Sequence, residues 1–256
     1  AHRDHGKLEW TRLFRPAIVL AANGFKISPR LHRSIRIAKH LKDFAPARQY
    51  FFTPGGEPKP AGILLTNPEF ADTLRRIASG GADPFYGGVI GRDIIRTVRS
   101  APRNAGAMQL IDLIRYRAKK REALCRNYRR WHICTMPPPT SGGVTTLQIL
   151  GILERFDLGS LKPGSVQAVH LISEASRLAY ADRALYLADP DFVHVPVDEL
   201  LSKSYLDKRA GLISTKRTMG KATAGNLPNI GRDWRSGEAL EFPSTSHLSV
   251  IDEDGN

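Results

Sequence analysis

STSHLSVID, over residues 244–252, is the most informative stretch of the sequence. Polar and apolar residues alternate from Ser246 to Asp252, which predicts a strand, and residues 252–256 predict the turn that would begin a hairpin. Residues 215–243, which come before it, contain glycine and proline and show little periodicity, so we expect an exposed, mobile connector. Because strands normally follow short loops, a long connector running directly into a strand calls for a chemical explanation.

Thr245 stands at the head of this predicted strand, where self-cleavage of the chain would explain the connector. Its hydroxyl can attack the carbonyl of Ser244, shift the acyl group from nitrogen to oxygen, and release a new N-terminus. The freed α-amine, with an ordinary pKa of about 7.7–8.0, can act as the base for the hydroxyl of the same residue. Thr245 is therefore a candidate nucleophile, and Ser244, Ser246 and Ser249 are rival hydroxyls. The competing interpretation is a threonine chosen for its β propensity.

The chain before residue 215 is predicted to be mostly helical, with glycine, proline and capping residues between its periodic segments. A stripe of Ala168, Ile172, Ala175 and Ala179 predicts the buried face of its longest helix. The predicted helices cover residues 8–23, 29–42, 67–78, 84–99, 112–117, 144–155, 166–187 and 202–212.

One hairpin is predicted, with strands at Leu124–Tyr128 and Trp131–Met136 and a turn between them. Cys125 and Cys134, the only two cysteines, lie on these strands. We favour two buried thiols over a disulfide, which the spacing also allows. The histidines do not fall at metal-ligand spacing, so no structural zinc site is predicted.

The net charge of +13 is concentrated in residues 1–50 and 111–130. In the first of these windows basic residues recur along one face of a predicted helix, as on an ordinary solvated surface. No nucleic-acid-binding motif accompanies them, so we expect no nucleic-acid partner. The longest apolar runs are far shorter than the ~20 residues of a membrane span, so none is predicted.

Thr245-Ser246-His247-Leu248-Ser249-Val250 followed by Gly255-Asn256 resembles the start of the small-subunit signature of γ-glutamyltransferases, a family of N-terminal-nucleophile hydrolases. Further segments resemble the family's large subunit in the same order along the chain. These are Leu8–Trp10 with Gly24-Phe25, Met136–Gly143 with Gln148–Leu150 and Glu154, Glu174 with Tyr180–Arg183, and Asp189–Phe192.

The resemblance implies an α/β fold, a four-layer αββα sandwich of which this chain would hold mostly the helical portion. It implies a large-subunit-like region at residues 1–244 and the start of a small-subunit-like segment at 245–256, separated by autocleavage before Thr245. The complete enzyme would be a heterodimer of large and small subunits that transfers a γ-glutamyl group from a glutathione-like substrate, through an ester on Thr245, to water or an amine. It implies no metal or organic cofactor, and it suggests a periplasmic or secreted protein.

Several other residues have two readings. His247 is interpreted as a hydrogen-bonded strand histidine rather than a general base, since the α-amine already fills that role. Residues 141–143 (Ser-Gly-Gly) are interpreted as a packing loop rather than an anion site at a helix start. Glu174 and Asp182, eight residues apart, are interpreted as structural charges.

Two alternatives to γ-glutamyl transfer stay open. Acylases of the same family remove glutaryl side chains from β-lactams by the same chemistry, and the Thr245-Ser246 pair is compatible with them. The other alternative is a non-catalytic, truncated protein that binds acidic partners through its basic windows. The family's substrate-binding and oxyanion groups would lie outside residues 1–256, so we expect this chain to be inactive alone.

Overall fold

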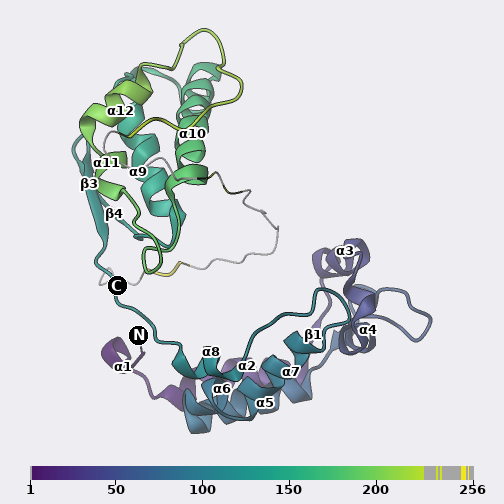
Figure 1. Cartoon of the computed structure of the whole chain (residues 1–256). Helices are drawn as coiled ribbons and strands as arrows, with labels where there is room; N and C mark the ends of the chain where they lie inside the picture. Colours follow the sequence, from purple (N-terminus) through teal and green to yellow (C-terminus); the bar gives the residue numbers. More distant parts are fainter. Residues whose placement is uncertain (1, 228–234, 236, 238–248, 252, 254–256) are drawn as a thin grey trace. The chain divides into compact units, whose positions relative to one another are not determined.

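The computed structural model describes residues 2–227, 235, 237, 249–251 and 253 (Figure 1). The chain divides into two compact units, Ala1–Lys119 and Lys120–Asn256. Both units are mainly helical, and the described residues form two small antiparallel sheets of two strands each. The prediction of a mostly helical chain with small fragments of sheet is confirmed.

The first unit consists of short helices around one long helix pair. α2 (Trp10–Asn23) packs along α5 (Pro68–Gly80), where the Trp10 indole donates a hydrogen bond to the Ile77 carbonyl at 3.1 Å. β1 (Phe25–Lys26) pairs with β2 (Leu64–Leu65). The other elements of this unit are α1 (His2–His5), α3 (Pro29–Ile37), the 3-10 helix η1 (Leu41–Asp43), α4 (Ala45–Phe51), α6 (Asp83–Tyr86), α7 (Val89–Arg99) and α8 (Leu110–Arg115).

Local signals set the ends of the first helices. Gly24 ends α2 with φ 85°, a conformation that favours glycine. The Ser28 hydroxyl accepts a hydrogen bond from the Leu31 amide at 3.1 Å and so caps α3, as predicted. The prediction that this helix continues to residue 42 is wrong, because α3 ends at Ile37 and η1 follows.

The prediction of a single helix over residues 84–99 is also wrong, since two separate helices, α6 and α7, cover this range. Gly88 lies at the break, and a Cβ there would come within 2.8 Å of the Pro84 backbone. This close approach of two backbones requires glycine, which is also a poor residue in the middle of a helix. The unpredicted α4 begins with Pro46 in its first turn, where proline is well tolerated.

The second unit packs three helices against a hairpin. β3 (Leu124–Tyr128) and β4 (Trp131–Thr135) form the predicted hairpin, with a two-residue turn and with the second strand ending one residue before its predicted end. α9 (Ser141–Leu153) contacts α10 (Val166–Tyr186), α12 (Lys203–Ala210) and β3. The 3-10 helix η2 (Leu158–Ser160) and α11 (Val197–Leu200) complete the described elements of this unit.

The core of the second unit lies between α9, α10 and α12. α9 is buried on several sides because nearly all its residues are apolar or small. The predicted buried stripe of α10 is wrong at Ile172, which is 46% exposed, whereas Leu171 and Leu178 are buried. Two clusters form this core: Ile152, Leu153, Leu171, Ala175, Leu178, Leu206, Ala210 and Ile213; and Val144, Leu147, Tyr186, Leu200, Leu201, Tyr205 and Leu227.

Candidate functional site

The predicted nucleophile Thr245 lies outside the described residues, as do Ser244, Ser246 and His247. The structure does describe residues 249–251 from the same predicted strand. These are not in a strand, and the Val250 and Ile251 side chains are 74% and 79% exposed. The strand prediction is therefore wrong for these three residues, because an alternating pattern alone does not form a strand without a ladder of backbone hydrogen bonds.

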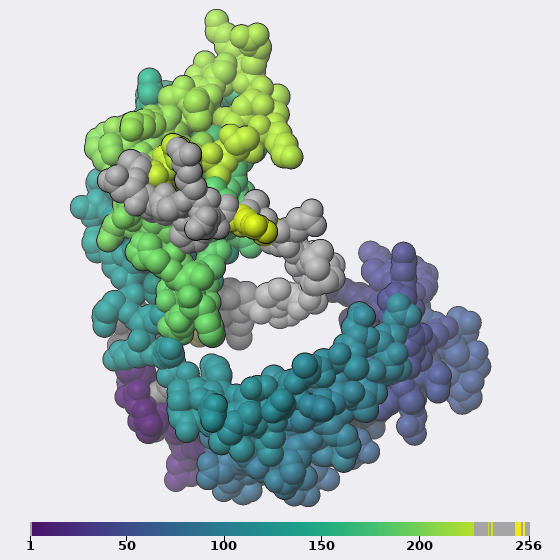
Figure 2. All heavy atoms as spheres, in the orientation of Figure 1, coloured from purple at the N-terminus to yellow at the C-terminus, as the bar shows by residue number. Residues whose placement is uncertain are grey.

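The chain leading toward Thr245 is described without a gap as far as Leu227, and Thr218–Leu227 is called here the anchored segment. It follows α12 and packs on the apolar clusters of the second unit, and Figure 2 shows its yellow-green atoms against the green atoms of that unit. Met219 and Ala222 pack on the first apolar cluster, and Leu227 is buried in the second. The sequence predicts an exposed, mobile connector here, yet the anchored segment is held by the hydrogen bonds and apolar contacts of a packed loop.

Glu174, on α10, holds the beginning of the anchored segment. Its carboxylate is almost fully buried and accepts hydrogen bonds at 2.7 Å from the Thr218 hydroxyl and at 2.7 Å from the Met219 amide. Arg177, one turn later, forms a 3.3 Å ion pair with Glu174 and donates to the Gly220 carbonyl at 2.8 Å. Glu174 is structural, as predicted, but its partners lie mainly on a distant part of the chain.

Asp182 holds the end of the anchored segment. Its Oδ1 accepts hydrogen bonds from the Gly225 amide at 2.8 Å and from Arg209 Nη2 at 2.9 Å, and its Oδ2 accepts one from Gln148 Nε2 at 3.1 Å. Arg209, on α12, also donates to the carbonyls of Leu178 and Thr223. A buried ion pair thus joins α10, α12 and the anchored segment.

Burial affects the two carboxyl groups differently. For Asp182, burial raises the pKa and outweighs the opposing hydrogen bond from Gly225 and the charge of Arg209. For Glu174, burial also acts to raise the pKa, but the hydrogen bonds from Met219 and Thr218 prevail and lower it. Glu174 is thereby kept as a carboxylate, the form that can accept both hydrogen bonds.

Two buried polar atoms beside this ion pair, Gln148 Oε1 and Arg209 Nε, have no hydrogen-bond partner within the described part of the chain. Burial and the nearby charge of Asp182 raise the pKa of Tyr205, so its hydroxyl stays protonated. Sequence reasoning missed Arg209 and Tyr205. They lie one helical turn apart on α12. This spacing predicts that the two side chains share one face of the helix, but it does not predict that Asp182 is buried against that face.

Residues 141–143 form the first turn of α9. The Ser141 hydroxyl accepts a hydrogen bond from Arg183 Nε at 2.9 Å. A Cβ at Gly143 would clash with the Met136 carbonyl, whereas one at Gly142 would meet open space. Gly143 therefore allows close packing of α9 on the chain at Met136, which agrees with the predicted packing role, but the prediction of a loop is wrong because residues 141–143 are helical.

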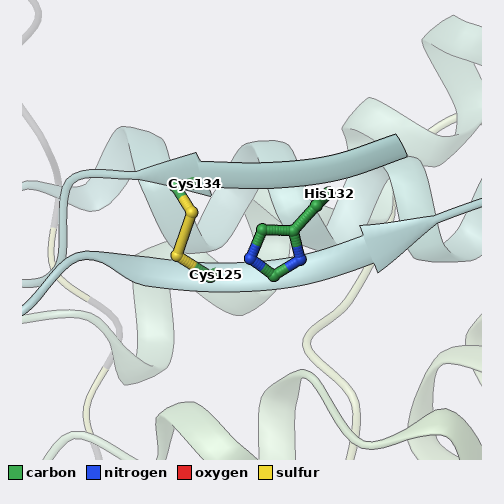
Figure 3. Close-up of side chains that lie close together, drawn as sticks. All are labelled: Cys125, His132 and Cys134. Atoms are coloured by element: carbon green, nitrogen blue, oxygen red, sulfur yellow. A yellow bond between two sulfur atoms is a disulfide. The ribbon is translucent and has the colours of Figure 1, made fainter.

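Cys125 and Cys134 are joined by a disulfide, so the favoured prediction of two buried thiols is wrong (Figure 3). The physical reason is register: a two-residue turn places the two cysteines directly opposite each other, with their Cα atoms 4.1 Å apart. Cys134 is exposed and Cys125 is half-buried. His132 lies beside them, and its ligand atom and the two sulfurs are all within 4.8 Å of one another.

Among the helices that the structure describes, none is both long enough and apolar enough to cross a lipid bilayer.

Comparisons with known proteins agree on one family. Residues 1–256 match the family model described as "Gamma-glutamyltranspeptidase". Over 98% of its length the chain is 37% identical to the "Acylase ACY 1 proenzyme" of Pseudomonas sp. (strain SE83) and 34% identical to the "Glutathione hydrolase proenzyme" of Escherichia coli (strain K12). It spans 42% of the length of each of these curated relatives.

The crystal structure of Helicobacter pylori gamma-glutamyltranspeptidase is similar with a TM-score of 0.81 and 33% identity, over 90% of this chain and 66% of that one. This similarity confirms the predicted α/β fold class, of which the described residues form a mostly helical part. On these grounds the chain belongs to the γ-glutamyltranspeptidase family.

Proposed function

We propose that this chain is part of a γ-glutamyl-transferring enzyme that cleaves itself before Thr245 and then uses Thr245 as its nucleophile. The acyl donor is a glutathione-like γ-glutamyl amide, and the acceptor is water or an amine. The observation that carries the proposal is the match to the family over the whole chain, together with the Ser244-Thr245-Ser246 sequence. A relative of this chain is named as a glutathione hydrolase proenzyme, which supports both the activity and the processing.

The proposed self-cleavage begins with attack of the Thr245 hydroxyl on the Ser244 carbonyl. As the ester forms, the C–N bond breaks and frees the Thr245 α-amine; water then hydrolyses the ester and releases the Ser244 carboxylate and the Thr245 hydroxyl. The anchored segment supports this step, because its hydrogen bonds to the buried Glu174 and Asp182 carboxylates hold the chain up to Leu227, seventeen residues before Ser244. The product that ends at Ser244 therefore keeps the anchored segment attached to the second unit.

In the proposed transfer reaction, the Thr245 α-amine accepts the proton of its own hydroxyl, which attacks the γ-carbonyl of the donor. The donor amine leaves with a proton, and a γ-glutamyl ester remains on Thr245. Water or an acceptor amine then attacks this ester and frees Thr245. The curated relatives are longer than this chain, so the groups that bind the donor are assigned to the remainder of the complete enzyme.

The processing step is tested by mass spectrometry of the chain co-expressed with the C-terminal segment that its relatives carry. Cleavage should give a product ending at Ser244 and a second product beginning at Thr245. Thr245→Ala should remain uncleaved, and Ser246→Ala serves as the matched control because it removes only the neighbouring hydroxyl. Cleavage of Thr245→Ala at the same bond would refute the role of Thr245.

The transfer step is tested with a γ-glutamyl anilide and a glutamine-analogue inhibitor. The co-expressed protein should release the aniline, and the inhibitor should add one acyl group at Thr245. Absence of both, in a protein that has been cleaved correctly, would contradict the proposal. It would favour a non-catalytic protein, for which salt-sensitive retention on heparin would be the expected property of the basic windows.

A glutaryl acylase is the second candidate, because a relative at 37% identity is named as an acylase proenzyme. Glutaryl and γ-glutamyl groups differ by the α-amine of the donor. Parallel assays with glutaryl and γ-glutamyl anilides therefore separate the two functions. Our proposal requires a higher kcat/KM for the γ-glutamyl compound, and a preference for the glutaryl compound would reassign the enzyme.

A further inference from the structure

We propose that the β3–β4 hairpin is a redox-gated zinc site, in which Cys125, Cys134 and His132 bind Zn²⁺ only after their disulfide has been reduced. This inference concerns the second unit alone and does not depend on the proposed function. The three side chains lie together on one face of the hairpin (Figure 3). Their ligand atoms are already within 4.8 Å of one another.

The hairpin positions the three ligands by its register. Cys125 faces Cys134, and the next pair on the same face is Asn127 and His132. The imidazole lies beside the disulfide with one ring nitrogen directed at it (Figure 3). Two thiolates and one imidazole form a ligand set that suits zinc, whereas magnesium and calcium prefer oxygen.

Asn127 orients the imidazole for this role. Its Oδ1 lies 2.8 Å from His132 Nδ1, and because an amide oxygen can only accept, this contact favours the tautomer with the proton on Nδ1. The lone pair of the neutral ring is therefore on Nε2, which is free to bind a metal. In metal-binding histidines the ring nitrogen that does not bind the metal regularly donates a hydrogen bond to a neighbouring polar group, which fixes the tautomer.

The geometry requires only a small rearrangement. With Zn–S bonds of about 2.3 Å and a Zn–N bond of about 2.0 Å, tetrahedral ligand atoms are roughly 3.5–4 Å apart. The sulfurs must separate after reduction, and the imidazole must approach them by about 1 Å. Three protein ligands leave the fourth position to water.

The hairpin is held in place by contacts other than the disulfide. Leu124 and Ile133 pack on the second apolar cluster from the opposite face. Arg126 pairs with Asp198 at 2.8 Å, and the Arg129 amide donates to Glu154 at 3.1 Å. We therefore expect the hairpin to keep its register after reduction, so that the two thiols remain opposite each other.

The gating step is a thiol–disulfide exchange with a dithiol reductant. A reductant thiolate attacks the exposed Sγ of Cys134, the S–S bond breaks, and Cys125 leaves as a thiolate. The second reductant thiol resolves the mixed disulfide, so the reductant becomes a disulfide and the protein holds two thiols. Binding of Zn²⁺ then releases two protons from these thiols.

The test uses the full chain reduced with dithiothreitol, freed of reductant without air, and titrated with Co²⁺ as a spectroscopic substitute for zinc. We expect one Co²⁺ per chain with a thiolate-to-cobalt charge-transfer band, displaced by Zn²⁺. The oxidised chain should give no such band. Reduced protein that gives no thiolate band would overturn the proposal, as would an equal band and equal affinity in the Cys134→Ser variant, which keeps only one thiol.

A second variant keeps both cysteines and therefore the disulfide. Loss of a group that only orients a metal ligand typically weakens metal binding by about 10–100-fold. His132 is itself a proposed ligand, so His132→Ala should weaken Co²⁺ binding by at least the upper end of this range, roughly 100-fold or more. His40→Ala, at an exposed histidine of the first unit, is the matched control and should bind as the unaltered chain does. Equal affinity of His132→Ala and the unaltered chain would refute the site as assigned.

Discussion

Replacement of Arg209 by methionine should strongly destabilise the second unit. The Arg209 side chain is 5% exposed and the Asp182 side chain is fully buried, and Arg209 Nη2 is within 3.1 Å of three oxygen acceptors. Arg209→Met leaves the Asp182 carboxyl without its counter-charge while keeping most of the apolar stem. Removal of one partner from a buried ion pair typically costs about 3–5 kcal/mol.

Hydrogen exchange measured by mass spectrometry can resolve this effect within the second unit. Since about 1.4 kcal/mol is a tenfold change in an equilibrium constant, exchange protection in α10 and α12 should fall by roughly 10²–10⁴-fold. Peptides from the first unit provide an internal reference. Lys208→Met, at the exposed neighbouring position on α12, is the matched control and should change stability by no more than about 0.5 kcal/mol.

The double variant Asp182→Asn, Arg209→Met distinguishes an unpaired charge from simple loss of packing. If the charge is responsible, removing it should restore about 1–2 kcal/mol relative to Arg209→Met alone. The reasoning fails if Arg209→Met costs less than about 1 kcal/mol. It also fails if the double variant is no more stable than the single one.

Three further predictions concern separate features. The pKa of Glu174 in the folded protein lies below its ordinary value of 4.5. The carboxylate therefore contributes its full stabilisation above pH 4.5, and this contribution is lost as the pH falls through the folded pKa. The free energy of unfolding of Glu174→Gln, measured with urea, should accordingly depend less on pH in this acidic range. Gly143→Ala should cost about 1–3 kcal/mol in thermal unfolding because its Cβ meets a backbone carbonyl, whereas Gly142→Ala, which meets open space, should cost nothing or stabilise slightly. Ser28→Ala should cost about 0.5–2 kcal/mol through loss of the α3 cap, seen as faster exchange in α3, and unchanged exchange there would contradict this role.

Features that depend on neighbouring residues were predictable from the sequence. The Leu124–Tyr128 strand has its predicted bounds, and α3 begins at the predicted cap, Ser28. The disulfide between Cys125 and Cys134 was within reach of the same reasoning. A hairpin with a two-residue turn already places these cysteines opposite each other. This geometry predicts a disulfide better than the general tendency of cysteines to be buried thiols, on which the wrong prediction was based.

Features that depend on distant partners were not predictable. Glu174 meets Thr218 and Met219, more than forty residues away, and Asp182 meets Arg209 on another helix. Helical periodicity indicates that such residues share a face, but it does not indicate what packs against that face. For the candidate site, the resemblance points to Thr245, which lies outside the described residues, so its assignment as nucleophile stays a prediction.

The two buried carboxylates fix the register of the anchored segment in a way that apolar contacts could not. Glu174 and Asp182 are eight residues apart, about 12 Å along α10, and they accept hydrogen bonds from the Met219 and Gly225 amides. Apolar contacts are non-directional, so those of Ala222 and Leu227 would tolerate a small shift along the helix. A shift by one residue would instead move both amides away from their acceptors and leave two buried carboxylates poorly paired. The described chain therefore reaches Leu227 in one defined register on the second unit.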